Sequence, residues 1–124
     1  MIHLDTSFLI RALLRGSSED RRLREWLRRE EPLGISSIGW AEFLCGPVEP
    51  RQVELATRLL REPEPFVGED AGTSAMLFNH GGRRRGSLVD CMIAAIALRA
   101  GAPLATANPA DFRRFRAAGL RLAC

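Results

Sequence analysis

Short apolar runs alternate with longer amphipathic stretches along the whole chain. The short runs, bounded by proline, glycine or polar residues, are typical of buried strands and occupy residues 1–4, 33–36, 65–67, 103–106 and 120–123. Helical patterns lie between them, over residues 6–14, 18–31, 37–45, 50–61, 69–79, 87–100 and 109–118. Strands that alternate with helices form a parallel sheet covered on both faces. We therefore predict an α/β protein, a three-layer α/β/α sandwich with about five strands, as one domain over residues 1–124.

The ends of several helices carry recognisable signals. Ser18 with Glu19 and Asp20 places a hydroxyl and negative charge at a helix start, and Gly46 with Pro47 marks a helix end. The helix over residues 87–100 is predicted to be the most buried, because residues 91–98 contain no polar face. Apolar residues at 38, 41 and 45 predict that Glu42 lies on or beside the inward face of its helix.

The composition is that of a soluble globular protein, with 46% hydrophobic and 27% charged residues. No apolar segment is long enough to span a bilayer, so we expect a cytoplasmic protein without membrane contact. Cys45, Cys91 and Cys124 are widely separated and match neither a metal-binding nor a disulfide pattern; we expect core or surface thiols.

All eighteen basic residues are arginine, and the net charge is +3. Arginine grips phosphate groups with two N–H donors, so the composition is compatible with a nucleic-acid partner, but a GC-rich genome would produce the same bias. Arg83, Arg84 and Arg85 could contact RNA or a protein partner, or form a solvated loop. Trp40 could stack on a base or belong to the core.

Four acidic residues stand apart from the charged helix faces: Asp5, Glu42, Asp90 and Asp111. Each follows a strand or lies near the start of a helix, and the carboxyl ends of parallel strands meet at one rim of a sheet, where ligands bind. Structural roles are also possible, with Asp5 and Asp90 as helix N-caps and Glu42 paired with an arginine. Carboxylates gathered at one rim would repel one another unless a divalent cation lay between them, and oxygen ligands favour Mg²⁺ or Mn²⁺.

Such a pocket suits phosphodiester hydrolysis, since a divalent cation activates water and offsets charge at phosphorus. Asp5 and Asp90 would be direct metal ligands, while Glu42 would bind a second ion or orient the water. Four polar residues near the same strand ends could hydrogen-bond water or phosphate: Thr6, Ser7, Thr106 and Asn108.

The ordered motifs resemble the PIN-domain family, specifically its VapC-type toxin ribonucleases. The resemblance spans nearly the whole chain and rests on these segments: Leu4-Asp5-Thr6-Ser7; Ser36-Ser37 leading to Glu42 and Gly46; Asp90 with Ile93-Ala94-Ala95; and residues 104–112, from Leu104-Ala105-Thr106 to Asp111-Phe112. It implies an α/β/α sandwich, a divalent-metal site and an endoribonuclease that cleaves single-stranded RNA. It further implies a homodimer and a cognate antitoxin that covers the acidic groove.

The same resemblance places Asp5, Glu42 and Asp90 on the three principal acids of the family. The fourth position falls at Asn108 or at Asp111. An amide at position 108 would weaken a second metal site, so we expect one firmly held ion.

Two other acidic-pocket enzymes do not fit the sequence. A haloacid-type phosphotransferase needs a second aspartate at position 7, which is serine, and a response-regulator receiver needs a lysine, which the chain lacks. Two alternatives to a toxin remain: an RNA-processing PIN nuclease without an antitoxin, and a PIN-like RNA- or protein-binding module that has lost turnover. The presence of all three principal acids favours an enzyme.

Overall fold

The computed structural model describes residues 1–123. Over these residues the chain forms three strands, seven α-helices and one 3₁₀ helix, whose bounds are as follows: β1 (Ile2–Leu4), α1 (Thr6–Ala12), α2 (Ser18–Arg28), β2 (Leu33–Ile35), α3 (Ser37–Cys45), α4 (Pro50–Leu59), α5 (Gly68–His80), α6 (Leu88–Ala100), β3 (Leu104–Ala105), α7 (Pro109–Phe112) and η1 (Arg113–Ala118).

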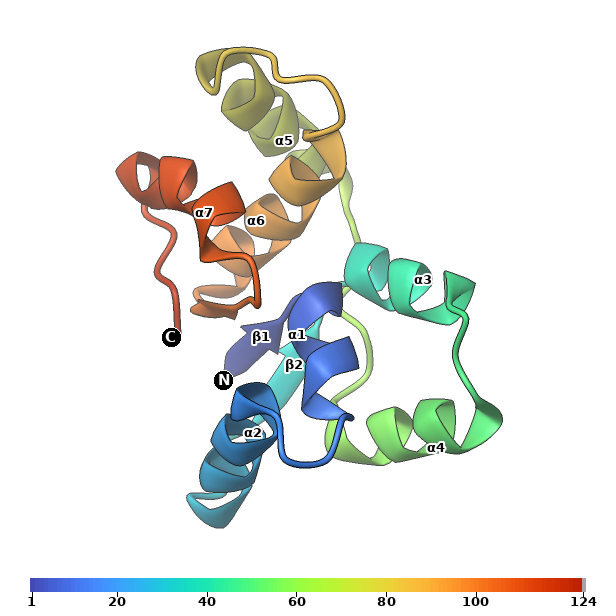
Figure 1. The fold of residues 1–124 in the computed structure, drawn as a ribbon. Helices are drawn as coiled ribbons and strands as arrows, with labels where there is room; N and C mark the ends of the chain where they lie inside the picture. The colour runs from blue at the N-terminus through green and yellow to red at the C-terminus, as the bar shows by residue number, and fades with distance from the viewer. Residues whose placement is uncertain (124) are drawn as a thin grey trace.

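The strands form a parallel sheet in the order β2-β1-β3. Leu4, the last residue of β1, is paired with Ile35 of β2 and with Ala105 of β3. One buried cluster packs α1, α2 and α4 against the sheet, and a second packs α5, α6, α7 and η1. Figure 1 shows these two groups on opposite sides of the central strands. The predicted three-layer α/β/α sandwich is confirmed, and all strands end at the same edge.

The predicted number of strands was wrong. Residues 65–67 and 120–123 do not form strands; instead, single parallel bridges join Ser36 to Glu64 and Leu104 to Leu122. Pro63 and Pro65 lack the N–H that a ladder needs, and the Phe66 N–H bonds to the Ser37 hydroxyl rather than to a strand. At the other edge, β3 has only two residues, so the segment over residues 120–123 forms a bridge with one residue of β3, Leu104.

The helices follow the sequence pattern closely. The helix over residues 37–45 is confirmed, while the one predicted over residues 109–118 divides into α7 and η1. Helix α6 is buried along residues 93–97, as its apolar sequence predicts. Cys45 is exposed and Cys91 buried, both as free thiols, and Cys124 lies outside the described residues. Within residues 1–123, no helix has the length and apolar character needed to cross a membrane.

A buried ion pair fixes α5 against α6. Asp70 is 1% exposed, and Arg99 Nε donates to its two carboxylate oxygens at 3.0 and 3.1 Å. The same guanidinium bonds Glu64 at 3.0 Å and the Pro65 carbonyl at 2.7 Å. Because a buried charge must be paired, this network holds α5, α6 and the segment beside β2 in one arrangement.

Candidate active site

Asp5 lies at the carboxyl end of the central strand and also begins α1. Its side chain is 5% exposed, and its Oδ1 accepts hydrogen bonds from the Phe8 N–H at 2.9 Å and the Ser7 hydroxyl at 2.7 Å. The first of these bonds is the N-cap of α1. Burial raises the pKa of Asp5 although its hydrogen bonds lower it, and the charge of Asp111 raises it further. The N-cap and site interpretations of Asp5 are therefore compatible.

Two hydroxyl groups tie Asp5 to the end of β3. Thr106 Oγ1 donates to Asp5 Oδ2 at 2.6 Å and accepts from the Asn108 N–H at 3.0 Å. Ser7 Oγ, which donates to Asp5, accepts from the Ala107 N–H at 3.1 Å. Each hydroxyl thus donates a hydrogen bond to Asp5 and accepts one from a backbone N–H of the segment after β3. These bonds orient the carboxylate.

Thr6 links the start of α1 to α3. Its hydroxyl donates to the Gly39 carbonyl at 2.8 Å and lies 3.2 Å from Glu42 Oε1 in a second, longer hydrogen bond. A Cβ on Gly39 would lie 3.3 Å from Ser36 Oγ and 3.5 Å from Thr6 Oγ1, so glycine permits this close approach. Glu42 is consequently held near the end of β1.

The predicted inward position of Glu42 was wrong. Glu42, Ala41 and Cys45 are exposed, and α3 instead buries Gly39 and Phe43. The helix is apolar on nearly every side, so its sequence could not indicate which face meets the core. Trp40 is partly buried, with its ring 5.3 Å from that of Phe43.

Asp90 and Asp111 complete the acidic group. Asp90 lies in the first turn of α6, where Ser87 is the N-cap residue, so Asp90 is not the cap. Burial raises the pKa of Asp90 to about 6, and the charges of Asp111, Asp5 and Glu42 all contribute, opposed by Arg114. The four acids therefore share one electrostatic region. Asn108 is exposed and precedes α7, and it is the exposed Asp111 whose charge acts on both Asp5 and Asp90.

The donor set fits a hard divalent cation. The acids supply only oxygen ligands. At Asp90, the charge of Arg114 lowers the pKa by less than burial and the neighbouring acids raise it, so a further positive charge would be favourable there. Within residues 1–123, no three His, Cys, Asp or Glu side chains lie close enough together to hold an ion as they stand. The metal ligands named from the sequence stay a prediction.

Arg114 is a site residue that the sequence reasoning missed. Its charge lowers the pKa of Asp90, its guanidinium lies 4.6 Å from the Phe115 ring centroid, and its Nε is buried without a hydrogen-bond partner among residues 1–123. The one signal in the sequence is that Arg114 follows Asp111 by three residues, which places both on one side of a helix.

A family model describes nearly the whole chain: the PIN domain model matches residues 2–118. This chain belongs to the PIN-domain family. No curated protein matches it in sequence. Its PIN domain is similar to chains of three solved structures, all toxin–antitoxin complexes.

The first is VapBC-1 from nontypeable Haemophilus influenzae, with 25% identity, a TM-score of 0.75 and coverage of 98% of this chain and 96% of that chain. The second is a toxin–antitoxin complex from Klebsiella pneumoniae, with 25% identity, a TM-score of 0.70 and 91% coverage of each chain. The third is VapBC2 from Rickettsia felis bound to a promoter DNA fragment, with 23% identity, a TM-score of 0.75 and coverage of 98% and 97%. The resemblance to a VapC-type PIN domain is confirmed.

Proposed function

We propose that this PIN domain is a Mg²⁺- or Mn²⁺-dependent endoribonuclease that cleaves single-stranded RNA and is the toxin of a toxin–antitoxin pair. The observation that carries the proposal is that burial and the charges of Asp111, Asp5 and Glu42 raise the pKa of Asp90 at the carboxyl edge of a PIN-type sheet. Asp5 and Asp90 both have raised pKa values, and buried acids of this kind in one region are typical of a metal-assisted hydrolytic site. The similar toxin–antitoxin complexes support a toxin over an RNA-processing nuclease without an antitoxin.

Each acid has a separate part in this proposal. Asp5 and Asp90 would hold the cation, whose chemistry there would be to activate water and to offset charge on the phosphate. Glu42 would accept a proton from the attacking water, and its hydrogen bond from Thr6 supports this role. Asp111 fills the fourth acidic position rather than Asn108, because its charge acts on both Asp5 and Asp90. Ser7 and Thr106 hold Asp5 in its orientation.

Sequencing of RNA ends after brief induction tests the enzyme and the substrate together. New ends should appear with the unaltered chain and be missing with Asp5→Asn. Purified protein should cut unstructured RNA with Mg²⁺ and lose this activity with a chelator. An absence of cutting with either metal, together with measurable RNA binding, would favour the inert binding module.

We expect the metal-free protein to become less stable as the pH is raised from about 4 to about 6. The pKa of Asp90 is 3.8 in an unfolded chain and about 6 in the fold, so in this interval the folded state binds more protons and a rise in pH favours unfolding. The full shift corresponds to about 3 kcal/mol in a shielded site, and solvent screening at half-buried Asp90 reduces it to about 1 to 2 kcal/mol. Thermal unfolding in the presence of a chelator measures this loss of stability. Subtracting the pH dependence of the Asp90→Asn variant isolates the contribution of Asp90 from that of His3, whose lowered pKa acts in the opposite direction.

Mn²⁺ should reverse this loss above pH 6, because only the folded state brings the acids together to bind it. The melting temperature should rise with Mn²⁺ concentration in the unaltered chain, and much less in Asp90→Asn. An equal rise in both proteins would contradict the assignment of Asp90 as a ligand.

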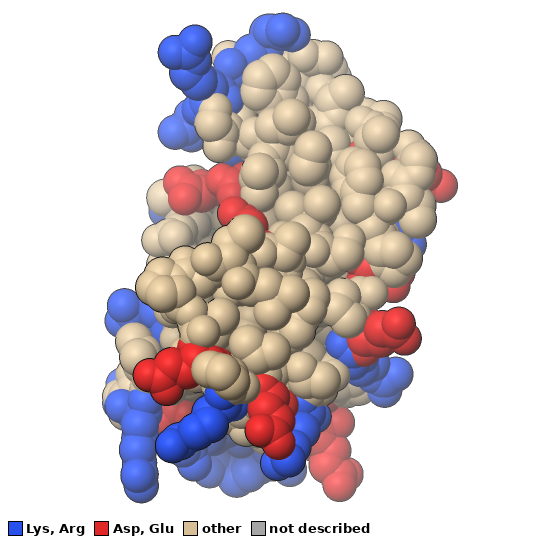
Figure 2. Space-filling model, turned by 90° about the vertical axis from the view of Figure 1, so that its right-hand side faces the viewer, with Lys and Arg blue, Asp and Glu red and all other residues tan. Residues whose placement is uncertain are grey.

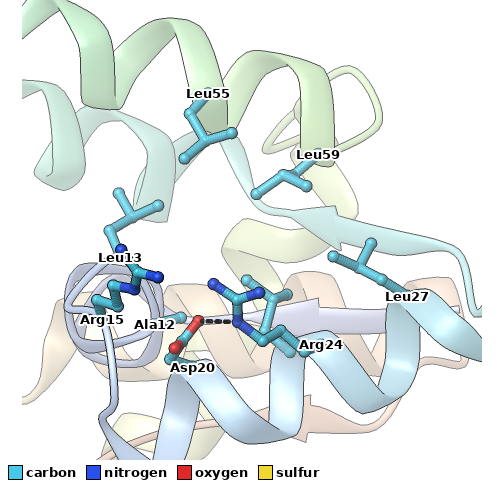
Figure 3. Close-up of a pocket in the computed structure, with 9 residues that line it drawn as sticks. Ala12, Leu13, Arg15, Asp20, Arg24, Leu27, Leu55 and Leu59 are labelled. Atoms are coloured by element: carbon cyan, nitrogen blue, oxygen red, sulfur yellow. Dashed lines mark hydrogen bonds and ion pairs between the residues drawn. The ribbon is translucent and has the colours of Figure 1, made fainter.

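An apolar groove between α1, α2 and α4 is the proposed contact for an antitoxin. It has a volume of about 320 Å³, and leucines of α4 face those of α1 and α2 across it (Figure 3). Leu27 and Leu55 at its edges are 41% and 47% exposed, and Arg15 and the Asp20–Arg24 ion pair add charge along it. A groove of this kind fits an amphipathic helix whose apolar side chains enter it.

Two variants, Leu27→Asp and Leu55→Asp, should each fail to co-purify with the product of the adjacent gene. Buried charge at either edge would cost several kcal/mol of binding free energy, on the order of the hot-spot losses seen at protein interfaces. Both variants should retain RNA cleavage. Loss of cleavage as well would show that the substitutions disturb the fold.

The face over α3 and α5 is the proposed homodimer contact. Figure 2 shows a broad area there with few charged side chains. The exposed large apolar residues of α3 and α6, and the one directly before α5, are Leu44, Leu88, Val89 and Val67. A second copy is the occupant we propose, and sedimentation should give twice the mass of the chain, falling to one copy when Leu44 and Val67 are replaced by Glu.

A further inference from the structure

Six arginines, on the loop over residues 83–85 and on η1, lack the ion pairs that half of the other twelve arginines form within residues 1–123. On α2, α4 and α6, arginines such as Arg24, Arg58 and Arg99 form ion pairs with neighbouring acids. Across residues 1–123, no carboxylate lies within ion-pair distance of any of these six: Arg83, Arg84, Arg85, Arg113, Arg114 and Arg116. Residues 71–89 and 112–123 contain no acidic residue at all. The positive charge of these two segments is therefore not neutralised within the described chain.

The two segments lie side by side. Arg114 Cδ lies 3.8 Å from the position that a Cβ would take on Gly81, which begins the loop carrying Arg83 to Arg85. A cavity of about 340 Å³ between the end of α5 and η1 is lined by His80, Gly81, Arg114 and Phe115. Figure 1 places this loop at the top of the molecule, and Figure 2 shows basic side chains there, above an acidic patch.

Hydrogen bonds hold the loop backbone, and two of its three arginines extend from it, while Arg83 folds back onto the end of α5. Gly82, Arg83 and Gly86 have φ values of 82°, 54° and 81°, and the Ser87 hydroxyl donates to the Arg84 carbonyl at 2.7 Å. Arg83 bonds the Asn79 side chain at 2.6 Å and lies over the Phe78 ring. Arg84 and Arg85 are exposed. A fixed loop that presents two unpaired guanidinium groups is preorganised for a polyanion.

Arg114 connects this basic surface to the acids. It lies against Phe115 on η1, and its Nε has no hydrogen-bond partner among residues 1–123. Its charge lowers the pKa of Asp90. Positive charge therefore runs from the loop to the edge of the acidic group. A strand of RNA that reaches the acids needs such a surface, because the carboxylates repel its phosphates.

We propose that the loop over residues 83–85 and η1 form one phosphate-binding rim, which holds single-stranded RNA beside the acidic group. This inference rests on the proposed ribonuclease function and names the surface that binds its substrate. The contacts are to phosphates, so they add affinity without selecting a base sequence.

Binding of a fluorescein-labelled, unstructured oligouridylate tests the rim. Every protein in the comparison carries Asp5→Asn, so that the RNA is not cut. Arg84→Gln with Arg85→Gln should weaken binding about tenfold at low salt and make the slope of log affinity against log salt shallower by about 1.4, the value for two phosphates of a single strand. Arg113→Gln with Arg116→Gln should have an effect of similar size.

Arg51→Gln with Arg61→Gln is the matched control. Both arginines are exposed, form no ion pair within residues 1–123, and lie at or just after α4, at the opposite end of the molecule from the loop (Figure 1). The control removes the same charge and should change affinity much less. Circular dichroism and thermal unfolding establish that all the variants are folded.

The outcomes separate this inference from the proposed function. Equal losses in the rim and control variants would overturn the rim, as would unchanged RNA binding in either rim variant. Loss of antitoxin binding with RNA binding intact would assign the loop to a protein interface and also overturn it. Failure of the Asp5→Asn protein with unaltered arginines to bind RNA at all would count against the ribonuclease itself.

Discussion

Replacing Asp90 by asparagine should abolish RNA cleavage and leave a folded protein that is more stable than the original without metal. Burial and three neighbouring acids raise the pKa of Asp90 to about 6, so its charged form destabilises the fold. Asparagine has nearly the same shape and no charge, which removes this cost. It also removes one of the two proposed direct metal ligands, and we expect cleavage to fall by at least about a hundredfold, the scale of losing one charge-stabilising group.

Cleavage rate and melting temperature, measured on the same preparation, test this prediction. Glu62→Gln is a suitable control, because Glu62 is an exposed acid just beyond α4 and has no part in the acidic group. It should change neither quantity. A stable Asp90→Asn protein that cleaves RNA at the original rate would remove Asp90 from the catalytic site, and an unfolded one would contradict its proposed cost to stability.

The opposite effects on stability and activity distinguish Asp90 from the structural acids of this protein. Asp70 is more deeply buried, but Arg99 donates to its carboxylate oxygens and the Val67 N–H adds a third contact. Asp90 has no comparable partner within residues 1–123, since Arg114 acts on it only through its charge. A protein retains a destabilising acid where function needs it, which is the argument for a catalytic Asp90.

The arrangement of layers and the edge that carries the acids could be predicted from the sequence. Both follow from apolar runs that alternate with helical patterns, because parallel strands necessarily bring their carboxyl ends together. Asp5 was located by its place directly after β1, and Asp90 by its isolation at the head of an apolar helix. Both features are properties of neighbouring residues in the chain, so they can be recognised in a single sequence.

The orientation of α3 could not be predicted in this way. The helix is apolar nearly all round, and its inward face is set by distant segments: the Gly39 carbonyl accepts from Thr6, 33 positions away, and Phe43 packs in the buried cluster with β1, β2 and α1. The expected outer strands failed for a related reason: prolines and a side-chain hydrogen bond interrupt residues 65–67, and the two-residue β3 offers residues 120–123 a single bridge. The role of Arg114 depends on η1 lying beside Gly81, which is again a long-range contact. Pattern reasoning is reliable for local periodicity and fails where distant segments decide.

Asparagine and alanine at position 5 should separate the two roles of that carboxylate. In Asp5→Asn, the amide oxygen can still accept from the Phe8 N–H, and its NH₂ group can donate to Thr106 Oγ1, so stability should change by less than about 0.5 kcal/mol. In Asp5→Ala, the cap and both hydroxyl partners are lost in a buried position, and the free energy of unfolding should fall by about 2 kcal/mol. Both variants lack the charge, so both should lose cleavage by at least about a hundredfold.

The comparison is decisive because activity and stability respond to different atoms of one side chain. Denaturant unfolding and RNA cleavage should rank the two variants differently: nearly equal in activity and clearly unequal in stability. Ser7→Ala serves as the intermediate control, since it removes one hydrogen bond to Asp5 while keeping the carboxylate, and cleavage should fall about tenfold, as for other groups that orient a metal ligand. If Asp5→Asn kept its stability and its activity, Asp5 would be a helix cap alone. The acidic group would then have lost the member that joins it to the central strand, and the ribonuclease assignment would fail with it.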